Sequence, residues 1–469
     1  MSGMATSLDA FAQNVERDTG ERGILSGEGV AAYSLGGRTP ALVARPGSHE
    51  AAARTLARAG EAGLAVFPWG GGTGRGAGYP PARYDLALST ERLSRVVEFL
   101  RDDLTAIVEA GMTVKALNGL TLPEGQNAGF DPAHPGTATV GGTLFGGRSG
   151  PMRVRYGRAR DRFMRVRVAL ADGNSHTYGA LVVKNVTGYD TIRLFAGSWG
   201  TLAVATELAV RLYKVPEALG ARAAGFLDAE AAFGAARLLM ATPLAPEWVE
   251  VFDAGRAVAL KKWLQDIPLP GPWCLAAAFG EFEEGLGEPL LRLEEIAMNS
   301  GGKDLVRLGG ENTRQLGEAL ANPPETDYFG EETLAFRASG RLDQLPRFAA
   351  AAQKAAEAGG YRFAVAAHAG SGVLRCWLER EDGGGNAALA WRTFAVLSRE
   401  GSDSSRGRAV HVRVESGAEA IDAAGGAEGE VPLWGEDALD PAAFDLMTKV
   451  KREYDPKRIL SPGRFVGRL

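Results

Sequence analysis

A glycine-rich stretch follows a short apolar segment and reads AVFPWGGGTGRGAGYP over residues 65–80. Glycine lacks a Cβ and tolerates positive φ, so a ligand can approach the main chain closely. Such a loop also points several N–H donors at one place, which is a common way to hold phosphate. Because the stretch contains no acidic residue and follows an apolar strand, it favours an anion-binding loop over a flexible surface loop.

Two familiar phosphate loops fit this stretch poorly. A P-loop needs a Lys after its last glycine, and none follows here. Gly72, Gly74 and Ala77 match the spacing of a dinucleotide fingerprint, but Tyr79-Pro80-Pro81 stops the helix that should come next. The segment YDLALS then reads as another strand, so the motif alone leaves the type of nucleotide loop open.

A second glycine-rich run spans residues 123–150 and reads PEGQNAGFDPAHPGTATVGGTLFGGRSG. It holds too many turn residues for a plain helix or strand. A loop of this length inside a compact domain is usually functional. Near its end stands Arg148, the first of eight arginines between residues 148 and 167, a segment with a single Asp. These arginines either neutralise a diphosphate, dock an acidic partner or form a solvated face.

The composition indicates which class of protein this chain belongs to. The chain has 469 residues, of which 45% are hydrophobic and 23% charged, which is typical of a soluble globular protein with two or more domains. A net charge of −5 predicts no affinity for nucleic acid. No apolar run is long enough to cross a membrane, and the N-terminus lacks the pattern of a signal peptide. The two cysteines form no metal-binding motif, so we expect a reducing, cytoplasmic compartment.

The elements that must position the two glycine-rich runs can be read from periodicity and capping residues. We expect strands at 40–46, 64–69, 85–89, 96–99, 105–108 and 163–171, with an Asp172-Gly173 turn after the last, and helices at 1–20, 48–63 and 113–122. Beyond residue 217, strands alternate with helices. This alternation predicts an antiparallel sheet with helices on one face.

The order of these elements, with four spaced motifs, resembles the FAD-binding domain of the vanillyl-alcohol-oxidase superfamily of PCMH-type flavoproteins. The motifs are the first glycine loop, VEAGMTVKALN, HPGTATVGGTLFGGRSGPMRVRYGRARD and KNVTGYDTIRLFAGSWGTLAVATE, and they lie within residues 38–217. The resemblance implies that FAD is the cofactor and that backbone amides of both runs wrap its diphosphate. The residues it implies for cofactor binding are Trp69, Gly70, Gly71, Gly72, Thr73, Gly74, Pro135, Gly136, Thr139, Gly141, Gly142, Ser149, Gly150, Tyr156, Gly157, Val204 and Arg464.

The C-terminus, PLWGED followed by LMTKVKREYDPKRILSPGRFVGRL, resembles the tail of the E subunit of bacterial glycolate oxidase. That resemblance implies an FAD-binding subunit of a multi-subunit 2-hydroxyacid dehydrogenase, with a second flavoprotein and an iron–sulfur subunit as partners. It places the chain in the cytoplasm, peripheral to the inner membrane at most through those partners.

Candidate catalytic residues lie at His368 and Arg375. Related single-chain 2-hydroxyacid dehydrogenases carry H-x-G-D-G-N-x-H here, and two of its histidines can hold a metal. This sequence has His368-Ala369-Gly370-Ser371-Gly372-Val373-Leu374-Arg375, and Glu415 is not followed by a His. One His and one distant Glu do not make a metal site, so we predict none. His368 as base and Arg375 as carboxylate clamp are what an active enzyme would use.

The sequence therefore predicts an α+β protein in four parts. These are an N-terminal helix and lead-in (1–37), a two-part PCMH-type FAD-binding domain (38–217), an antiparallel sheet-plus-helices substrate or cap domain (218–430) and a C-terminal segment that returns to the FAD domain (431–469). Because the segment His368–Arg375 lacks the acidic residue and the second histidine of the related motif, the sequence favours a subunit that relays electrons or supports the assembly. A self-sufficient 2-hydroxyacid dehydrogenase and a flavin-free scaffold are the alternatives.

Overall fold

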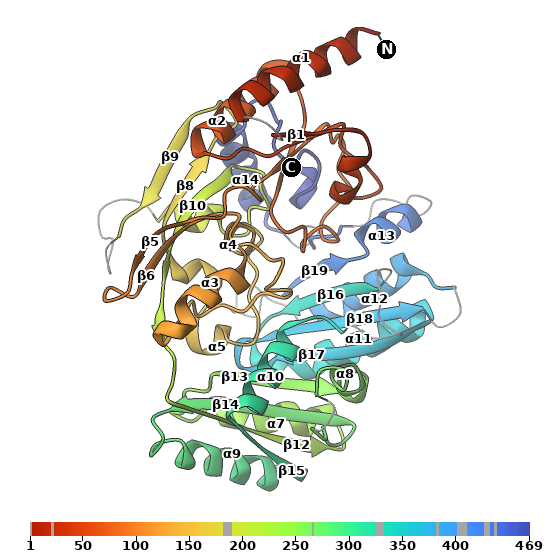
Figure 1. The fold of residues 1–469 in the computed structure, drawn as a ribbon. Helices are drawn as coiled ribbons and strands as arrows, with labels where there is room; N and C mark the ends of the chain where they lie inside the picture. The colour runs from red at the N-terminus through yellow and green to blue at the C-terminus, as the bar shows by residue number, and fades with distance from the viewer. Residues whose placement is uncertain are drawn as a thin grey trace. The chain divides into compact units, whose positions relative to one another are not determined.

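A computed structural model of the chain describes residues 2–19, 23–181, 190–264, 267–324, 333–380, 384–400, 410–425, 432–435 and 439–469 (Figure 1). The chain divides into two compact units. Unit 1 comprises Met1–Ser149, Arg158–Val215 and Glu436–Leu469, and unit 2 comprises Gly150–Gly157 and Pro216–Gly435. Part of the motif that follows the second glycine-rich run thus belongs to unit 2, and residues 182–189 of the last FAD-domain motif lie outside the described residues.

Within its described residues, unit 1 contains a four-stranded, a five-stranded and a two-stranded sheet. Its strands are β1 (Ile24–Leu25), β2 (Leu42–Ala44), β3 (Val66–Trp69), β4 (Leu86–Ser89), β5 (Val96–Leu100), β6 (Thr105–Glu109), β7 (Gln126–Asn127), β8 (Phe163–Ala169), β9 (Ser175–Gly179), β10 (Val204–Arg211) and β11 (Tyr213–Lys214). Its helices are α1 (Ser2–Thr19), α2 (His49–Ala62), α3 (Val114–Thr121), α4 (Val140–Phe145), α6 (Ile192–Phe195) and α14 (Pro441–Tyr454), with short 3-10 turns η1 (Gly27–Tyr33), η2 (Leu122–Glu124), η3 (Ala159–Arg162) and η8 (Val466–Arg468).

The four-stranded sheet, in the order β1-β2-β4-β3, presents the first glycine loop at the end of β3. Strands β2, β4 and β3 run parallel, which requires the crossover helix α2. As the sequence predicts, α2 begins where the Ser48 side chain accepts from the Ala51 N–H at 3.1 Å and ends at Gly63 in the left-handed conformation. Strands β2 and β4 are buried along their whole length and read as apolar runs, as parallel strands inside a sheet usually do.

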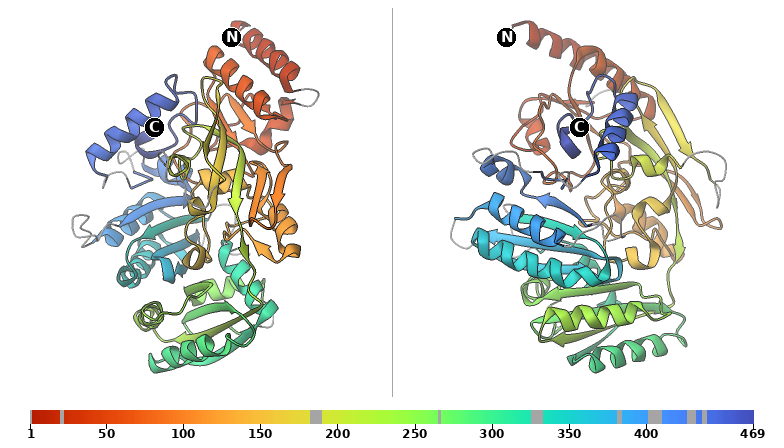
Figure 2. Two further views of the ribbon diagram at one scale, coloured as in Figure 1. Left: turned by 90° about the vertical axis from the view of Figure 1, so that its left-hand side faces the viewer. Right: turned by 180° about the vertical axis from the view of Figure 1, so that it is seen from behind.

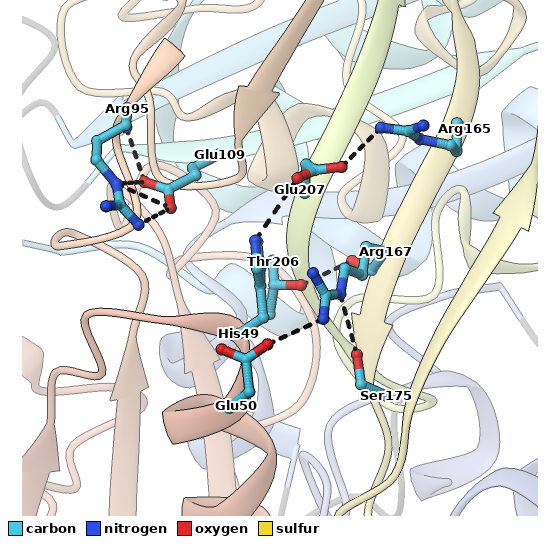
Figure 3. A network of polar contacts seen from close by, with 9 residues as sticks. All are labelled: His49, Glu50, Arg95, Glu109, Arg165, Arg167, Ser175, Thr206 and Glu207. Atoms are coloured by element: carbon cyan, nitrogen blue, oxygen red, sulfur yellow. Dashed lines mark hydrogen bonds and ion pairs between the residues drawn. The ribbon is translucent and has the colours of Figure 1, made fainter. Parts of the chain in front are cut away.

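The five-stranded antiparallel sheet, β5-β6-β10-β8-β9, is joined to α2 by side-chain contacts (Figure 3). Glu207 on β10 accepts from Arg165 at 2.8 Å and lies 3.6 Å from His49 Nε2. These neighbours, His49 above all, lower the pKa of the Glu207 carboxyl below its usual value. Arg167 binds Glu50 at 3.1 Å across the same junction. The network fixes β8 and β10 against helix α2.

The C-terminal segment completes the edge of the four-stranded sheet. Val66 and Leu460 form a parallel bridge, with hydrogen bonds from Val66 N–H to Ile459 O at 2.7 Å and from Ser461 N–H to Val66 O at 2.9 Å. A buried ion pair holds this segment: Lys451 Nζ donates to Asp455 at 2.7 Å and to the carbonyls of Thr201 and Leu460, each at 2.8 Å. Both ends of the chain therefore belong to unit 1 (Figure 1).

Unit 2 is built on an eight-stranded antiparallel sheet with the order β15-β12-β14-β13-β17-β18-β16-β19 among its described residues. The strands are β12 (Ala218–Phe226), β13 (Trp248–Asp253), β14 (Trp273–Glu281), β15 (Lys303–Gly309), β16 (Leu334–Ser339), β17 (Tyr361–His368), β18 (Val373–Arg380) and β19 (His411–Ser416). The helices are α5 (Arg153–Tyr156), α7 (Ala229–Met240), α8 (Ala254–Leu260), α9 (Gly287–Asn299), α10 (Gly310–Ala321), α11 (Leu345–Gly359), α12 (Ala387–Arg399) and α13 (Ala418–Gly425), with η4 (Leu342–Gln344) and η5 (Ala369–Ser371).

Helices cover both faces of this sheet, so the expectation of helices on one face is wrong. The larger layer, α7, α9, α11 and α12, lies across one face (Figure 2), where Phe233 of α7 packs against Trp273 with ring centroids 5.9 Å apart. On the opposite face, α10 approaches Trp248 so closely that a Cβ at Gly317 would lie 2.9 Å from the indole nitrogen. The helix α8 lies on that side too, with Arg256 over the ring of Trp377. Short Ala-rich helices gave no sequence signal of which face they cover.

Removing the buried cation at position 451 should destabilise unit 1. Lys451→Met leaves the Asp455 carboxylate buried without its ion-pair partner, which costs about 3–5 kcal/mol. We expect a fall in melting temperature of roughly 6–12 °C by differential scanning calorimetry. Lys449→Met is the matched control, because Lys449 forms an i,i+4 pair with Asp445 at 2.6 Å on the same helix but both side chains are more than half exposed. The control should change stability by less than about 1 kcal/mol; equal shifts for the two variants would contradict the role of the buried pair.

Candidate FAD cavity and a buried polar cluster

Unit 1 contains an open cavity of about 910 Å³ where its glycine-rich segments meet. The first glycine loop, α4, the Trp199–Ala205 segment and the C-terminal residues Ser461 and Arg464 form its walls. The two glycine-rich runs, whose convergence the sequence predicted, therefore border one cavity.

Glycines are required where the two runs touch, because any side chain would fill the space. A Cβ at Gly71 would lie 1.7 Å from the carbonyl oxygen of Thr137, and a Cβ at Gly70 would lie 2.4 Å from Thr139 Oγ1. In the same way, a Cβ at Gly141 would lie 2.8 Å from Ala110. The bare backbone thus serves the contact between two chain segments as well as access for a ligand.

The first loop also presents main-chain donors to the cavity. In the part of the chain that the structure describes, the N–H groups of Gly71, Gly72 and Thr73 donate to no other protein group. The charged residues of the cavity wall are Arg75, Arg148 and Arg464, and no carboxylate is among the described lining residues. Clustered amides and guanidinium groups without a competing anion fit a dinucleotide diphosphate, so the residues present are suited to FAD.

The residues that the resemblance implied for cofactor binding fall into two groups. Those that line the cavity are Trp69, Gly70, Gly71, Gly72, Thr73, Gly74, Thr139, Gly141, Gly142, Val204 and Arg464. Those outside its lining are Pro135, Gly136, Ser149, Gly150, Tyr156 and Gly157. Ser149 accepts from the Ala159 N–H at 3.2 Å, and the Pro135 carbonyl accepts from the Lys115 N–H at 2.8 Å. Gly150, Tyr156 and Gly157 belong to unit 2. Contact of each residue with FAD stays a prediction.

The Arg464 guanidinium holds the first glycine loop through hydrogen bonds to its carbonyls. It donates to the carbonyls of Arg75 at 2.7 Å, Tyr79 at 3.2 Å and Gly74 at 3.4 Å. Burial lowers the pKa of Arg464 to about 10. Because its donors are taken up by loop carbonyls, the side chain acts chiefly by holding the loop in shape.

The catalytic candidate His368, in unit 2, forms a buried pair with a residue that the sequence did not single out. His368 Nδ1 lies 2.8 Å from Glu250 Oε1, and both side chains are almost fully buried. An Nδ1–H that donates to the carboxylate leaves the lone pair on Nε2, and Nε2 has no hydrogen-bond partner among the described residues. Burial, followed by the guanidinium groups of Arg375, Arg337 and Arg153, lowers the pKa of His368 well below its usual value. The neutral imidazole is the form that can accept a proton.

Three arginines gather on the same face of the unit 2 sheet. The strand register places Arg375 opposite Arg337, and Arg337 opposite Arg413. Glu415 holds these like charges together: it lies 2.8 Å from Arg413, 3.0 Å from Arg375 and 3.6 Å from Arg337. We call these four side chains the arginine cluster. Since Ala366 lies opposite Arg375 and two residues from His368 on β17, the cluster and the histidine share a face.

Sequence reasoning missed Glu250, Arg337 and Arg413, and it treated Glu415 as too distant to matter. One signal existed: a carboxylate in the middle of the apolar strand EWVEVFD is costly to bury and so needs a partner. The partner, 118 residues away, was not readable without the strand order. On the cavity wall, Arg148 and Trp199 were also missed as individual residues.

Two absences concern the described residues only. No three His, Cys, Asp or Glu side chains come together there in a way that could hold a metal ion, and the absence of a metal stays a prediction. None of the described helices is both long enough and apolar enough to cross a bilayer.

The fold and the cavity define a PCMH-type FAD-binding flavoprotein. Residues 40–179 match the family model described as "FAD binding domain". Residues 215–388 and 429–465 match the model described as "FAD linked oxidases, C-terminal domain". The two models together span most of the chain, which belongs to the FAD-linked oxidase family of oxidoreductases, with FAD as cofactor.

The chain is similar to several 2-hydroxyacid-oxidising enzymes, over different shares of its length. D-lactate dehydrogenase of Archaeoglobus fulgidus is 28% identical over 91% of this chain and 92% of its own length. The glycolate oxidase subunit GlcD of Bacillus subtilis is 28% identical over 49% of each chain. D-2-hydroxyglutarate dehydrogenase of Xanthomonas citri is 33% identical over 38% of each chain. The specific likeness to the E subunit stays a prediction.

Solved structures support the fold. The 4-ethylphenol oxidase from Gulosibacter chungangensis matches with a TM-score of 0.71 and 16% identity, over 98% of this chain and 97% of its own. p-Cresol methylhydroxylase matches with a TM-score of 0.69 and 15% identity, over 98% and 96% of the two chains. At this level of identity the likeness concerns the fold alone.

A methyl group at position 71 should prevent FAD binding. Gly71→Ala places a Cβ 1.7 Å from the Thr137 carbonyl, so the two glycine-rich runs must separate. We expect at least a tenfold loss of bound flavin, measured as the ratio of absorbance at 450 nm to that at 280 nm in the purified protein. Gly119→Ala on α3 is the control, since nothing lies within 4 Å of the added Cβ; it should retain full flavin content. Normal flavin content in Gly71→Ala would refute the assignment of this cavity.

Proposed function

We propose that the chain is an FAD-dependent dehydrogenase of small 2-hydroxy acids that carries its own proton-accepting residue. The observation that supports this most strongly is the buried His368–Glu250 pair beside the arginine cluster. A base and a site for a carboxylate are the two protein groups that oxidation of a 2-hydroxy acid needs. The names of the relatives, lactate and 2-hydroxyglutarate dehydrogenases, agree with this substrate class.

In the proposed mechanism each group has one task. The arginine cluster binds the substrate carboxylate, because a guanidinium matches a carboxylate in charge and geometry. His368 accepts the hydroxyl proton at Nε2, and Glu250 keeps the ring in the orientation and tautomer that leave Nε2 bare. Bound FAD would supply the two-electron acceptor for the hydride from C2. The product is the 2-oxo acid.

A subunit that only relays electrons is the second candidate. The C-terminal resemblance to the E subunit of glycolate oxidase favours it, and GlcD of the same type of enzyme is a relative. In that case an iron–sulfur subunit and a second flavoprotein would be the partners, and a cytoplasmic chain would meet the inner membrane only through them. The flavin-free scaffold has the least support, because the cavity is open and its glycines are intact.

Anaerobic mixing with substrate separates these candidates. We expect D-lactate or glycolate to bleach the 450 nm absorbance of the isolated chain, and His368→Gln to slow the bleaching about 10²–10⁴-fold. His411→Gln is the control, because His411 lies on the same sheet but is exposed. Bleaching that appears only after partner subunits are added would favour the relay role and refute autonomous catalysis.

The pH dependence tests the assignment of the base. His368 accepts a proton only when neutral, so kcat/KM should fall as the pH drops through its pKa. Since that pKa lies well below 6.5, the acidic limb should lie below pH 6.5. Arg375→Met removes the largest of the charges that lower the pKa, so the limb should move to higher pH, measured by rapid-mixing flavin reduction. A limb that stays in place would exclude His368 as the titrating base.

A further inference from the structure

We propose that Arg148, held against the face of Trp199, is the side-chain cation that binds the diphosphate of FAD. Arg148 is the first of the eight arginines for which the sequence left three roles open. Among those eight, Arg148 is the one that lines the cavity of unit 1. Outside that lining, Arg165 pairs with Glu207, Arg167 with Glu50 and Arg155 with Glu247.

Three chain segments meet at this guanidinium. Its Cζ lies 5.6 Å from the centroid of the Trp199 ring. A Cβ at Gly74 would lie 3.0 Å from the Trp199 ring and 3.4 Å from Arg148 Nη2. The cation thus adjoins the glycine loop that lines the cavity. A guanidinium that uses its face against an aromatic ring still directs its N–H donors outward in the plane, where a phosphate can accept from them.

The backbone of Trp199 is strained in order to hold the ring there. Its φ is 55°, a left-handed conformation that is costly for a bulky residue. Hydrogen bonds fix the surrounding chain: Trp199 N–H donates to Phe145 O at 2.8 Å, and Arg148 N–H donates to Thr143 O at 3.0 Å. Strain that persists in a tightly bonded segment beside a cavity points to a binding role.

The other cations of the cavity wall are less suited to this role. Arg464 donates to three loop carbonyls, and the side chain of Arg75 is exposed on the loop. The inference concerns FAD binding and does not depend on the substrate. An unsubstituted chain that binds FAD but is not reduced by 2-hydroxy acids would count against the proposed function and not against Arg148.

Flavins with different numbers of phosphates test the proposal. The full-length apoprotein is titrated with FAD, FMN and riboflavin, and binding is followed by flavin fluorescence. For Arg148→Met we expect about ten- to hundredfold weaker binding of FAD and less than a twofold change for riboflavin, which has no phosphate. The dependence of FAD affinity on salt should also become shallower, because a charge that contacts phosphate has been removed. Arg148→Lys should recover most of the FAD affinity.

Arg193→Met is the matched control, because Arg193 lies in the same unit in an exposed pair with Asp190; it should bind all three flavins normally. Equal losses for FAD and riboflavin would overturn the proposal, since they would show that Arg148 supports the ring site or the fold. Unchanged FAD binding would overturn it as well. If Arg148→Met does not fold, as judged by its melting temperature, Arg148→Gln supplies the same comparison with a smaller change in polarity.

Discussion

The contact between two stretches of main chain, Gly71 against the carbonyl of Thr137, is the constraint on which the cavity of unit 1 depends. A backbone can pass this close to another only where neither carries a side chain in the gap. Once the two runs touch, their amides and the neighbouring guanidinium groups face one space. The strands and helices around them, with the network at His49 and Glu207, hold the two runs at this separation.

The two units carry their chemistry in different ways. In unit 1 the main chain supplies most donors, and the side chains of Arg464 and Lys451 act by fixing that main chain. In unit 2 the side chains themselves gather, and the strand register decides which of them meet. A change of side chain in the arginine cluster removes a contact directly, whereas a change in the glycine loop acts through the shape of the backbone.

Local features of the sequence were sufficient to predict the ends of several helices in unit 1. Ser48 and Gly63 mark the ends of α2 because capping is a local interaction, and Thr113 marks the start of α3 in the same way. Features that depend on distant pairing were not accessible. The partner of His368 became visible only when β13 and β17 were neighbours, and the choice of Arg148 among eight arginines required the shape of the cavity. The sequences of the Ala-rich helices do not indicate which face of the unit 2 sheet each of them covers.

The C-terminal segment that pairs with Val66 is synthesised last, which affects when the glycine loop can adopt its final shape. Arg464 contacts the carbonyl of Arg75 across 389 positions of sequence. The ribosome therefore releases the glycine loop long before the residues that brace it exist. We therefore expect flavin capture to follow translation of this last segment, since the loop lacks the hydrogen bonds from Arg464 until then.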